Sequence, residues 1–167
     1  RRVQVEDTTR IDRDMMFSDG VAVIFGGSGL LGSSISQNLK SNKYECLITS
    51  KNKKSNLKTN HLSKDIIFKF LKKNKPNLII NCIAGMDVDL CNKDFIYAYK
   101  SNVLTVKNIV TSLNELKIKC FFVHISTDQV YDSKKASTEK NANPSNNYGY
   151  TKFLSEKEAM KYKKTLI

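Results

Sequence analysis

A short apolar segment followed at once by a run of glycines most constrains the fold of this chain. Residues 21–25 read Val-Ala-Val-Ile-Phe, and Gly26, Gly29 and Gly32 follow at a spacing of three. An apolar run rich in β-branched residues is typical of a strand that is buried on both faces of a sheet. A tight turn after such a strand needs backbone angles that glycine adopts at little cost. The pattern therefore predicts a strand, a tight turn and a helix that starts near Leu30.

The alternation of strand and helix continues along the chain. Strands are predicted at 46–49, 78–83, 120–125 and, just beginning, 165–167; helices are predicted at 30–42, 63–74, 93–117 and 148–164. The first helix has Leu31, Ile35 and Leu39 on one face, and the helix at 93–117 is expected to be broken or frayed at its start. The polar segment 132–147 is predicted to be a loop. Strands that alternate with helices pair in parallel, so we expect an α/β fold with a doubly wound parallel sheet. Residues 20–167 would form this domain, preceded by a tail or linker at 1–19.

The glycine run also suits the binding of a dinucleotide. Missing side chains let a pyrophosphate approach the backbone amides at a helix N-terminus, where the helix dipole favours negative charge. Gly32 would let the helix pack closely on the strand. The spacing Gly-x-x-Gly-x-x-Gly resembles that of short-chain dehydrogenases rather than the Gly-x-Gly-x-x-Gly of the standard dinucleotide fold. An ordinary glycine-rich turn is the alternative, and the flanking strand and amphipathic helix argue against it.

The end of the second strand bears on the choice of nicotinamide cofactor. A site specific for NAD would place an acidic residue about 20 residues after the glycines, to hold the ribose 2′-hydroxyl. Here the chain reads Thr49-Ser50-Lys51-Asn52-Lys53. A hydroxyl and cations suit a 2′-phosphate, so NADPH is the expected cofactor, with NADH possible.

A tyrosine and a lysine lie four residues apart in the predicted helix at 148–164. Tyr148 and Lys152 would therefore face the same way. The ammonium can hold the phenol near a bound cofactor and lower its pKa from about 10 toward the range of a useful proton donor. Alone, the pair could be a surface tyrosine beside one of many lysines. With the glycine run and Ser126-Thr127-Asp128, it predicts a nicotinamide-dependent reductase or epimerase.

The net charge of +12 raises the question of nucleic-acid binding. The lysines are scattered along the chain, and the densest basic run, residues 51–58, has no aromatic side chains on which bases could stack. A solvated basic surface is the favoured interpretation, and nucleic acid is disfavoured as a partner.

The cysteines and the hydropathy pattern bear on the protein's surroundings. The four cysteines, Cys46, Cys82, Cys91 and Cys120, form no Cys-x-x-Cys pair, so we expect reduced, packed thiols and no metal site. No stretch approaches the roughly 20 apolar residues that span a bilayer. A cytoplasmic protein without a membrane partner is expected.

Residues 21–167 resemble the extended short-chain dehydrogenase/reductase superfamily, and within it the dTDP-4-dehydrorhamnose reductase family. The most specific segment, 123–132, reads V-H-I-S-T-D-Q-V-Y-D and is similar to the family's h-I-S-T-D-Y-V-F-D-G. Residues 144–152 read P-S-N-N-Y-G-Y-T-K, similar to P-x-N-x-Y-G-x-[ST]-K. Glu156 matches the family's Gly-Glu pair, with Ser155 in place of the glycine. Val88-Asp89 and Ser101-Asn102 fall where the family has V-D and V-N.

The resemblance implies a role for each residue of a catalytic set. Thr127 would hydrogen-bond the substrate carbonyl, with Ser126 as the alternative, since two adjacent hydroxyls cannot be ranked from sequence. Tyr148 would donate the proton as hydride arrives from the nicotinamide. Lys152 would bind the nicotinamide ribose and tune Tyr148. Such a reduction needs a hydride source, a proton donor and a polariser for the developing alkoxide.

The resemblance also implies contacts to substrate and cofactor. Asp128 and Gln129 would border the substrate, as would Ser126, and Asn102 would support the region of Lys152. The expected cofactor contacts are Gly26, Ser28, Gly29, Leu30, Leu31, Gly32, Ser50, Lys51, Cys82, Ala84, Asn102, Tyr148 and Lys152. Three positions depart from the family pattern: Gly85 replaces an aromatic residue near the cofactor, Lys58 an aspartate at the adenine, and Gln129 a tyrosine.

The expected function is the NADPH-dependent reduction of the 4-keto group of a nucleotide-linked 6-deoxysugar, as in rhamnose synthesis. One alternative is a nucleotide-sugar epimerase or dehydratase with bound NAD. Another is a non-catalytic, NADP-binding regulatory subunit like that of methionine adenosyltransferase. The expected partners are the nucleotide sugar and a possible second copy in a homodimer. Because the family's substrate lobe is largely missing from these residues, we expect the chain to be a fragment of a longer protein.

Overall fold

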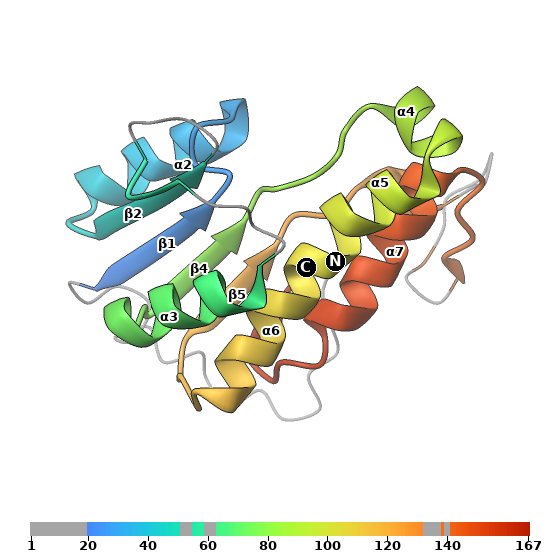
Figure 1. Cartoon of the computed structure of the whole chain (residues 1–167). Coiled ribbons are helices and arrows are strands. Elements are labelled where there is room, and N and C mark those ends of the chain that lie inside the picture. The colour runs from blue at the N-terminus through green and yellow to red at the C-terminus, as the bar shows by residue number, and fades with distance from the viewer. Residues whose placement is uncertain (1–19, 51–54, 59–62, 132–137, 139–140) are drawn as a thin grey trace.

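A computed structural model of the chain describes residues 20–50, 55–58, 63–131, 138 and 141–167. Helices and strands alternate along the described residues, as the sequence predicts (Figure 1). In chain order the elements are β1 (Val21–Phe25), α2 (Leu30–Ser41), β2 (Glu45–Ser50), β3 (Leu57–Lys58), α3 (Lys64–Asn74), β4 (Leu78–Asn81), α4 (Val88–Lys93), α5 (Phe95–Tyr99), the π-helix η1 (Lys100–Leu104), α6 (Thr105–Glu115), β5 (Phe121–His124), the 3₁₀ helix η2 (Asp128–Val130), α7 (Asn147–Ala159) and β6 (Thr165–Leu166).

The strands form one parallel sheet of six strands in the order β3-β2-β1-β4-β5-β6. β1 lies at its centre, with Val23 opposite Leu47 of β2 on one side and Ile79 of β4 on the other. The chain moves to one side of β1 through α2 and to the other side from β4 onward. In such sheets ligands bind beyond the carboxyl ends of the strands, at the point where the strand order reverses. The predicted doubly wound parallel fold is confirmed, and the point where its strand order reverses lies between the ends of β1 and β4.

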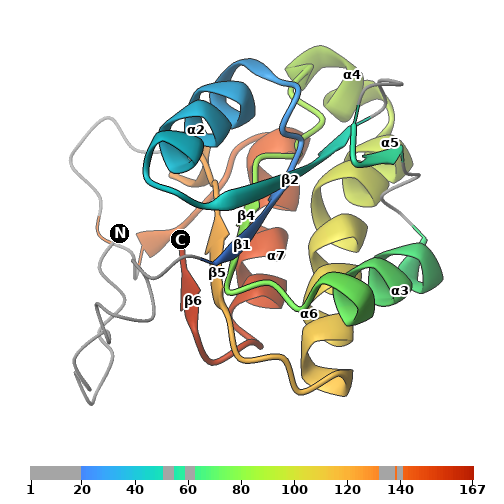
Figure 2. The same cartoon turned by 90° about the vertical axis from the view of Figure 1, so that its left-hand side faces the viewer.

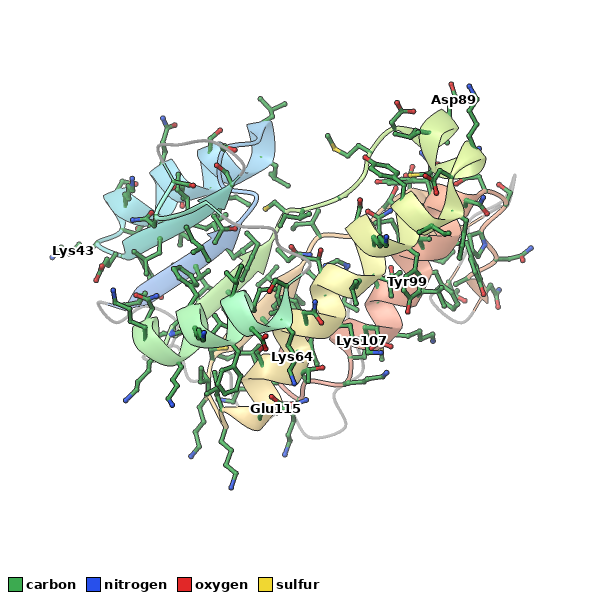
Figure 3. The ribbon with its side chains drawn as sticks, viewed as in Figure 1. Lys43, Lys64, Asp89, Tyr99, Lys107 and Glu115 are labelled. Atoms are coloured by element: carbon green, nitrogen blue, oxygen red, sulfur yellow. The ribbon has the colours of Figure 1, made fainter. Side chains whose placement is uncertain are left out.

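Helices cover both faces of the sheet. Figure 2 shows α2 on one face and α3 and α6 on the other, where α6 also packs on α7. Side chains of β1 alternate between the two faces, as strand geometry requires, so Val23 and Phe25 enter the main core while Ala22 and Ile24 are buried outside it. The main core lies between the sheet and the layer of α3, α6 and α7. At the rim of this layer an ion pair of 2.7 Å joins Lys64 of α3 to Glu115 of α6 (Figure 3).

Small residues make the closest contact between helix α2 and the sheet, while Ile35 and Leu39 of its apolar face are partly buried. Leu31 is 48% exposed, and the buried residues of the helix are Gly32 and Ser36. A Cβ at Gly32 would overlap the carbonyl oxygen of Gly26. The helix therefore approaches the strand too closely for large side chains on its inner face, and the apolar ones lie beside the contact or point outward.

The long helix predicted at 93–117 is broken at its start, as expected, and a separate helix precedes it. Asp94 has extended backbone angles and its carboxylate accepts a hydrogen bond of 2.9 Å from Tyr97 N, so it ends α4 and caps α5. Helix α4, with Asp89 at its outer tip (Figure 3), was not predicted. The last predicted helix is shorter than expected, since α7 ends at Ala159 rather than near 164.

Several predictions fall on residues outside the described part, namely the tail at 1–19, Lys51 and half of the loop at 132–147. Among the described residues no helix is long and apolar enough to cross a membrane. All four cysteines are free thiols, and Cys91 and Cys120 are buried, which agrees with the expected packed cysteines. In the same part of the chain no cluster of three or more His, Cys, Asp or Glu side chains could hold a metal ion.

Candidate active site

The glycine turn lies where the strand order reverses, between β1 and β4. Gly26 has a φ of +80°, a region that favours glycine, and its amide and that of Gly27 donate to the carbonyl of Thr49 at 3.0 and 3.2 Å. A Cβ at Gly26 would come within 3.2 Å of the backbone at Cys82 and Ile83. The turn is therefore held between the ends of β2 and β4, where only a residue without a side chain fits.

The start of helix α2 has the properties of an anion site. Its N-cap residue, Gly29, has no side chain to accept from the first amides, and the first turn carries no acidic residue. Ser28, Gly29 and Leu30 are exposed, and a Cβ at Gly29 would meet nothing closer than the Gly26 carbonyl at 3.3 Å. Gly29 thus leaves open space in front of the helix. The donors and this space fit the pyrophosphate of a dinucleotide.

Tyr148 lies in the first turn of α7, beside the loop that follows β5. Its hydroxyl lies near that of Thr127, which acts to lower the pKa of the phenol. Thr127 in turn accepts from Gln129 N at 3.3 Å and donates to the Asp128 carboxylate at 3.2 Å. The structure thus brings together a phenol and an alcohol from segments about 20 residues apart, at the carboxyl edge of the sheet. The same carbonyl oxygen could contact both hydroxyls.

The prediction that Lys152 lowers the pKa of Tyr148 is wrong for the chain without cofactor. Burial raises the pKa of Tyr148, the nearby Thr127 hydroxyl partly offsets this, and the nearby Cys91 and Asp128 raise it further. Lys152 is not among the groups that shift the pKa of Tyr148, and its Nζ donates to the carbonyl oxygen of Ile125 at 2.5 Å. Four-residue spacing places two side chains on one helix face, but it does not decide which partner the ammonium takes.

Lys152 is buried, with 2% of its surface exposed. Burial lowers the pKa of Lys152 to about 8, and the Cys82 thiol close to it acts in the opposite direction. Cys82 follows β4 and borders the glycine turn. Lys152 and the turn therefore belong to one site, spanning the ends of β1, β4 and β5.

The structure distinguishes the two adjacent hydroxyls that the sequence could not rank. The Ser126 hydroxyl donates to the carboxylate of Glu156 at 2.5 Å, and Glu156 is buried in α7. The Thr127 hydroxyl lies next to Tyr148 instead. Thr127 is thus the hydroxyl beside Tyr148, while Ser126 connects the loop to α7.

The start of α7 is docked on the loop that carries Thr127. Asn146, the N-cap of α7, accepts from Gly149 N at 2.7 Å and donates to the side-chain oxygen of Gln129 at 3.0 Å. A Cβ at Gly149 would overlap the carbonyl oxygen of Gln129. Position 149 therefore requires glycine, because helix α7 touches the backbone of the loop there. The Gln129 side chain takes part in this contact, and the Asp128 side chain is exposed.

Asn102 braces the site from inside the protein. It is buried in η1, where its side-chain oxygen accepts from Gly85 N at 2.7 Å and its amide donates to Thr151 Oγ1 at 3.0 Å. It therefore joins the segment after β4 to α7, one residue before Lys152. This is the supporting position that the sequence predicts, and both ends of the side chain are engaged.

The other predicted cofactor contacts lie near the carboxyl ends of the strands. Ser50 is buried at the end of β2, Cys82 and Ala84 are partly buried after β4, and Lys51 lies outside the described residues. Leu30 is 94% exposed at the start of α2. These residues line the carboxyl ends of β1, β2 and β4, where the topology places a ligand.

Four residues of the site were missed in the sequence: Asn81, Cys91, His124 and Ser155. Asn81 and His124 end β4 and β5, are directly paired in register and are buried. Polar side chains inside apolar strands are the signal that could have found them, since a buried polar group needs a partner. Their partners come from distant segments, so the sequence alone does not supply them.

Comparisons with known proteins agree with this fold. The subunit beta of methionine adenosyltransferase 2 from Danio rerio is 26% identical over 144 residues, which cover 84% of this chain and 43% of that protein. A solved dTDP-4-dehydrorhamnose reductase from Clostridium acetobutylicum is 32% identical with a TM-score of 0.77, and the match covers 87% of this chain and 51% of that one. A dTDP-4-dehydrorhamnose reductase from Bacillus anthracis, solved in complex with NADP, shares the fold at 22% identity with a TM-score of 0.78, over 88% of this chain and 51% of that one.

These matches cover most of this chain but only part of each protein that it resembles. This chain spans about half the length or less of the curated relatives that it matches. A protein-family model described as the RmlD substrate binding domain, by contrast, matches residues 21–167, nearly the whole of this chain. With its glycine turn, its six-stranded parallel sheet and its Tyr-Lys helix, the chain belongs to the RmlD substrate binding domain family.

Proposed function

We propose that this chain forms the cofactor-binding and catalytic part of an NADPH-dependent reductase that acts on the 4-keto group of a nucleotide-linked 6-deoxysugar. The observation that carries the proposal is the proximity of the Thr127 and Tyr148 side chains, beside the glycine turn and a buried Lys152. Two hydroxyls that can reach one oxygen, next to a site for a dinucleotide, are what carbonyl reduction requires.

In this proposal the bound nicotinamide supplies the hydride, which adds to the carbonyl carbon. Thr127 donates a hydrogen bond to the carbonyl oxygen and holds it beside Tyr148. Tyr148 transfers its proton to that oxygen, so the ketone becomes an alcohol, and the phenolate regains a proton from solvent. Because burial raises the pKa of Tyr148, the phenol holds its proton at neutral pH until negative charge develops on the substrate oxygen.

The remaining groups of the site bind and orient. The amides at the start of α2 would hold the pyrophosphate, and Lys152 would hold the nicotinamide ribose. Ser50 and Lys51 would contact the 2′-phosphate that distinguishes NADPH from NADH. Asp128 would border the sugar, while Gln129 would border it only through atoms that its bond to Asn146 leaves accessible.

The first test is a calorimetric titration of the chain with NADPH and, separately, with NADH. We expect binding of both, with NADPH tighter. The second test follows NADPH oxidation when a dTDP-linked 4-keto-6-deoxysugar is added to a protein that contains this chain. Failure of a folded chain to bind either cofactor would overturn the proposal.

Two alternatives predict other outcomes in the same assays. An epimerase or dehydratase with bound NAD would convert a nucleotide sugar without net consumption of NADPH. A regulatory subunit would bind NADP without turnover and would bind a methionine adenosyltransferase. The match to the Danio rerio subunit supports this second alternative. The intact set of Thr127, Tyr148 and Lys152 favours the enzyme.

A homodimer is also proposed, because apolar side chains are exposed where α5 and α7 lie side by side. Ile96 is 65% exposed, and the exposed rings of Phe95 and Tyr150 lie 6.3 Å apart between their centroids. Contiguous exposed apolar side chains of this kind often mark a protein interface.

A further inference from the structure

A chain of buried hydrogen bonds leads from β4 to the backbone of Lys152. The Asn81 side-chain nitrogen lies 3.1 Å from His124 Nδ1, and His124 Nε2 lies 2.8 Å from Ser155 Oγ. The Ser155 hydroxyl donates to the carbonyl oxygen of Lys152 at 2.7 Å. Asn81, His124 and Ser155 are all buried, and none of them was included in the predicted site.

Donor and acceptor counting assigns the tautomer of His124. The side-chain oxygen of Asn81 accepts from Ile83 N at 3.3 Å, which orients the amide so that its nitrogen donates to His124 Nδ1. Nδ1 must therefore carry no proton. Ser155 uses its own hydrogen on the Lys152 carbonyl, so the proton between Ser155 and His124 belongs to Nε2. The imidazole is neutral and protonated on Nε2.

The charges around His124 support the neutral form. Burial lowers the pKa of His124 well below its usual value, and the ammonium of Lys152 on α7 lowers it further. The groups that face the imidazole are the amide of Asn81 on β4, the hydroxyl of Ser155 on α7 and the ring of Phe122, which stacks on it at 6.3 Å between ring centroids. A second proton on Nδ1 would oppose the Asn81 amide, which also donates.

Lys152 is thereby held at two points, both connected to β5. Its carbonyl is tied through Ser155 to His124, and its ammonium donates to Ile125, the residue after His124. A helical serine often bonds to a carbonyl of the preceding turn with no wider role. Here the same serine also accepts from a strand, so the local bond is linked to the edge of the sheet.

We propose that His124, as the neutral Nε2–H tautomer, is a positioning residue that acts through Ser155 to hold Lys152 at the cofactor ribose. The part that concerns the ribose rests on the proposed function. The hydrogen bonds themselves, and their effect on the position of Lys152, do not depend on the proposed function. His124 touches neither substrate nor cofactor in this proposal.

The tautomer is tested by imidazole ¹⁵N NMR on the chain without cofactor. The chain has two histidines, His61 and His124, and the variant His61→Gln assigns the two signals. We expect His124 in the Nε2–H form, with nitrogen shifts that stay constant between about pH 5 and 8, where an ordinary histidine titrates. An Nδ1–H tautomer, or an ordinary titration, would overturn the inference.

The positioning role is tested with variants that separate the two ends of the imidazole. The amide of His124→Gln can take the place of Nε2 and donate to Ser155, while that of His124→Asn reaches only toward Asn81. We expect NADPH affinity within about threefold of wild type in His124→Gln, and about tenfold weaker in His124→Asn and Ser155→Ala. The control is Ser112→Ala, since the buried Ser112 makes the same kind of helical bond, to Asn108 O at 2.8 Å, but in α6 away from Lys152.

A readout without cofactor separates this inference from the proposed function. The titration of Lys152, followed by ¹³C NMR of its side chain, should have a pKa of about 8 in wild type and His124→Gln. In Ser155→Ala it should move toward its ordinary value, because a loosened ammonium gains solvent. An unchanged titration in Ser155→Ala would overturn the positioning role. If wild type binds no cofactor while these shifts occur, the proposed function fails and the positioning of Lys152 stands.

Discussion

At the scale of single residues, the site depends on which partner each polar group takes. Ser126 and Thr127 are adjacent and chemically alike, yet one is engaged with Glu156 and the other with Tyr148. Lys152 stands one turn from Tyr148, yet its ammonium donates to Ile125 O. Residue type therefore limits the candidates, and the tertiary contacts select among them.

Replacing Tyr148 with phenylalanine should remove turnover and keep the cofactor. The variant loses the proton donor, which contributes roughly 10²–10⁴-fold to such reactions, while the ring and the fold remain. NADPH oxidation and calorimetric NADPH binding measure the two effects. The matched control is Tyr150→Phe, which makes the same change two residues on, at an exposed side chain of the same helix. Equal activity in Tyr148→Phe and wild type would contradict the mechanism.

The burial of Lys152 should appear in the dependence of stability on pH. Its folded-state pKa of about 8 lies below the ordinary 10.5, so the unfolded chain binds more protons between these values. The free energy of unfolding should therefore rise with pH across this window, by about 3 kcal/mol from this group. Below pH 8 the cost of burying the charged ammonium is fully present.

This expectation is checked by urea unfolding of wild type and of Lys152→Met. Both proteins are measured at neutral pH and near pH 10.5, the upper end of the range between the two pKa values. The difference between the two proteins cancels the groups that they share. Wild type should gain stability relative to the variant as the pH rises, and a constant difference would mean that the ammonium is well solvated.

At the scale of elements, close contacts between backbone segments determine where glycine is needed. Helix α2 touches the turn at Gly32, and α7 touches the loop after β5 at Gly149, so a Cβ at either position overlaps a carbonyl oxygen. Gly29 differs, because a Cβ there would overlap no atom and would come close only to the Gly26 carbonyl, at 3.3 Å. Gly32 and Gly149 thus serve packing, and Gly29 is the position at which we propose that glycine serves binding.

This contrast predicts opposite results for two glycine substitutions in the same motif. Gly29→Val should leave the melting temperature nearly unchanged and abolish measurable NADPH binding, because the side chain fills the space for the pyrophosphate. Gly32→Ala should lower the melting temperature, because its Cβ forces α2 away from the turn. Thermal unfolding and calorimetry measure both. NADPH binding retained in Gly29→Val would place the pyrophosphate elsewhere.

At the scale of the whole molecule, the sheet topology gathers the site at one edge. The ends of β1, β4 and β5 supply the glycine turn, the segment that contains Cys82, and the loop that contains Thr127, while α7 closes the group with Tyr148 and Lys152. Long apolar side chains such as Leu30 and Met86 remain exposed after β1 and β4. The described residues thus supply the part of the site that lies at the carboxyl ends of the strands.

Association of two copies of the chain is a property of the whole molecule. Sedimentation of the chain over a range of concentrations should show a monomer–dimer equilibrium, and Ile96→Lys should shift it toward monomer by placing a charge among exposed apolar groups. Lys107→Glu, a charge change elsewhere on the helical layer, is the control for altered net charge (Figure 3). A monomer at every concentration would remove the dimer from the proposal.

Much of the fold could be predicted because the signals are local. The run at 21–25, the glycines after it and the later apolar strands match β1, the turn, β4 and β5 closely. The short strand β3 and helix α4 were missed, since neither has enough residues for a clear period. The close contact of α2 could not be predicted, because it is made by small residues that carry no apolar signal.

The sequence by itself determined the parallel α/β fold, the glycine turn and the identity of the groups that could perform the chemistry, because periodicity and residue type act over a few neighbouring residues. Only the tertiary structure decided that Thr127 rather than Ser126 meets Tyr148, that Lys152 is buried against Ile125, and that Asn81, His124 and Ser155 lead to it. Those pairings join segments from separate strands and helices. Their energies depend on burial and on donor–acceptor geometry, which exist only once the chain has packed.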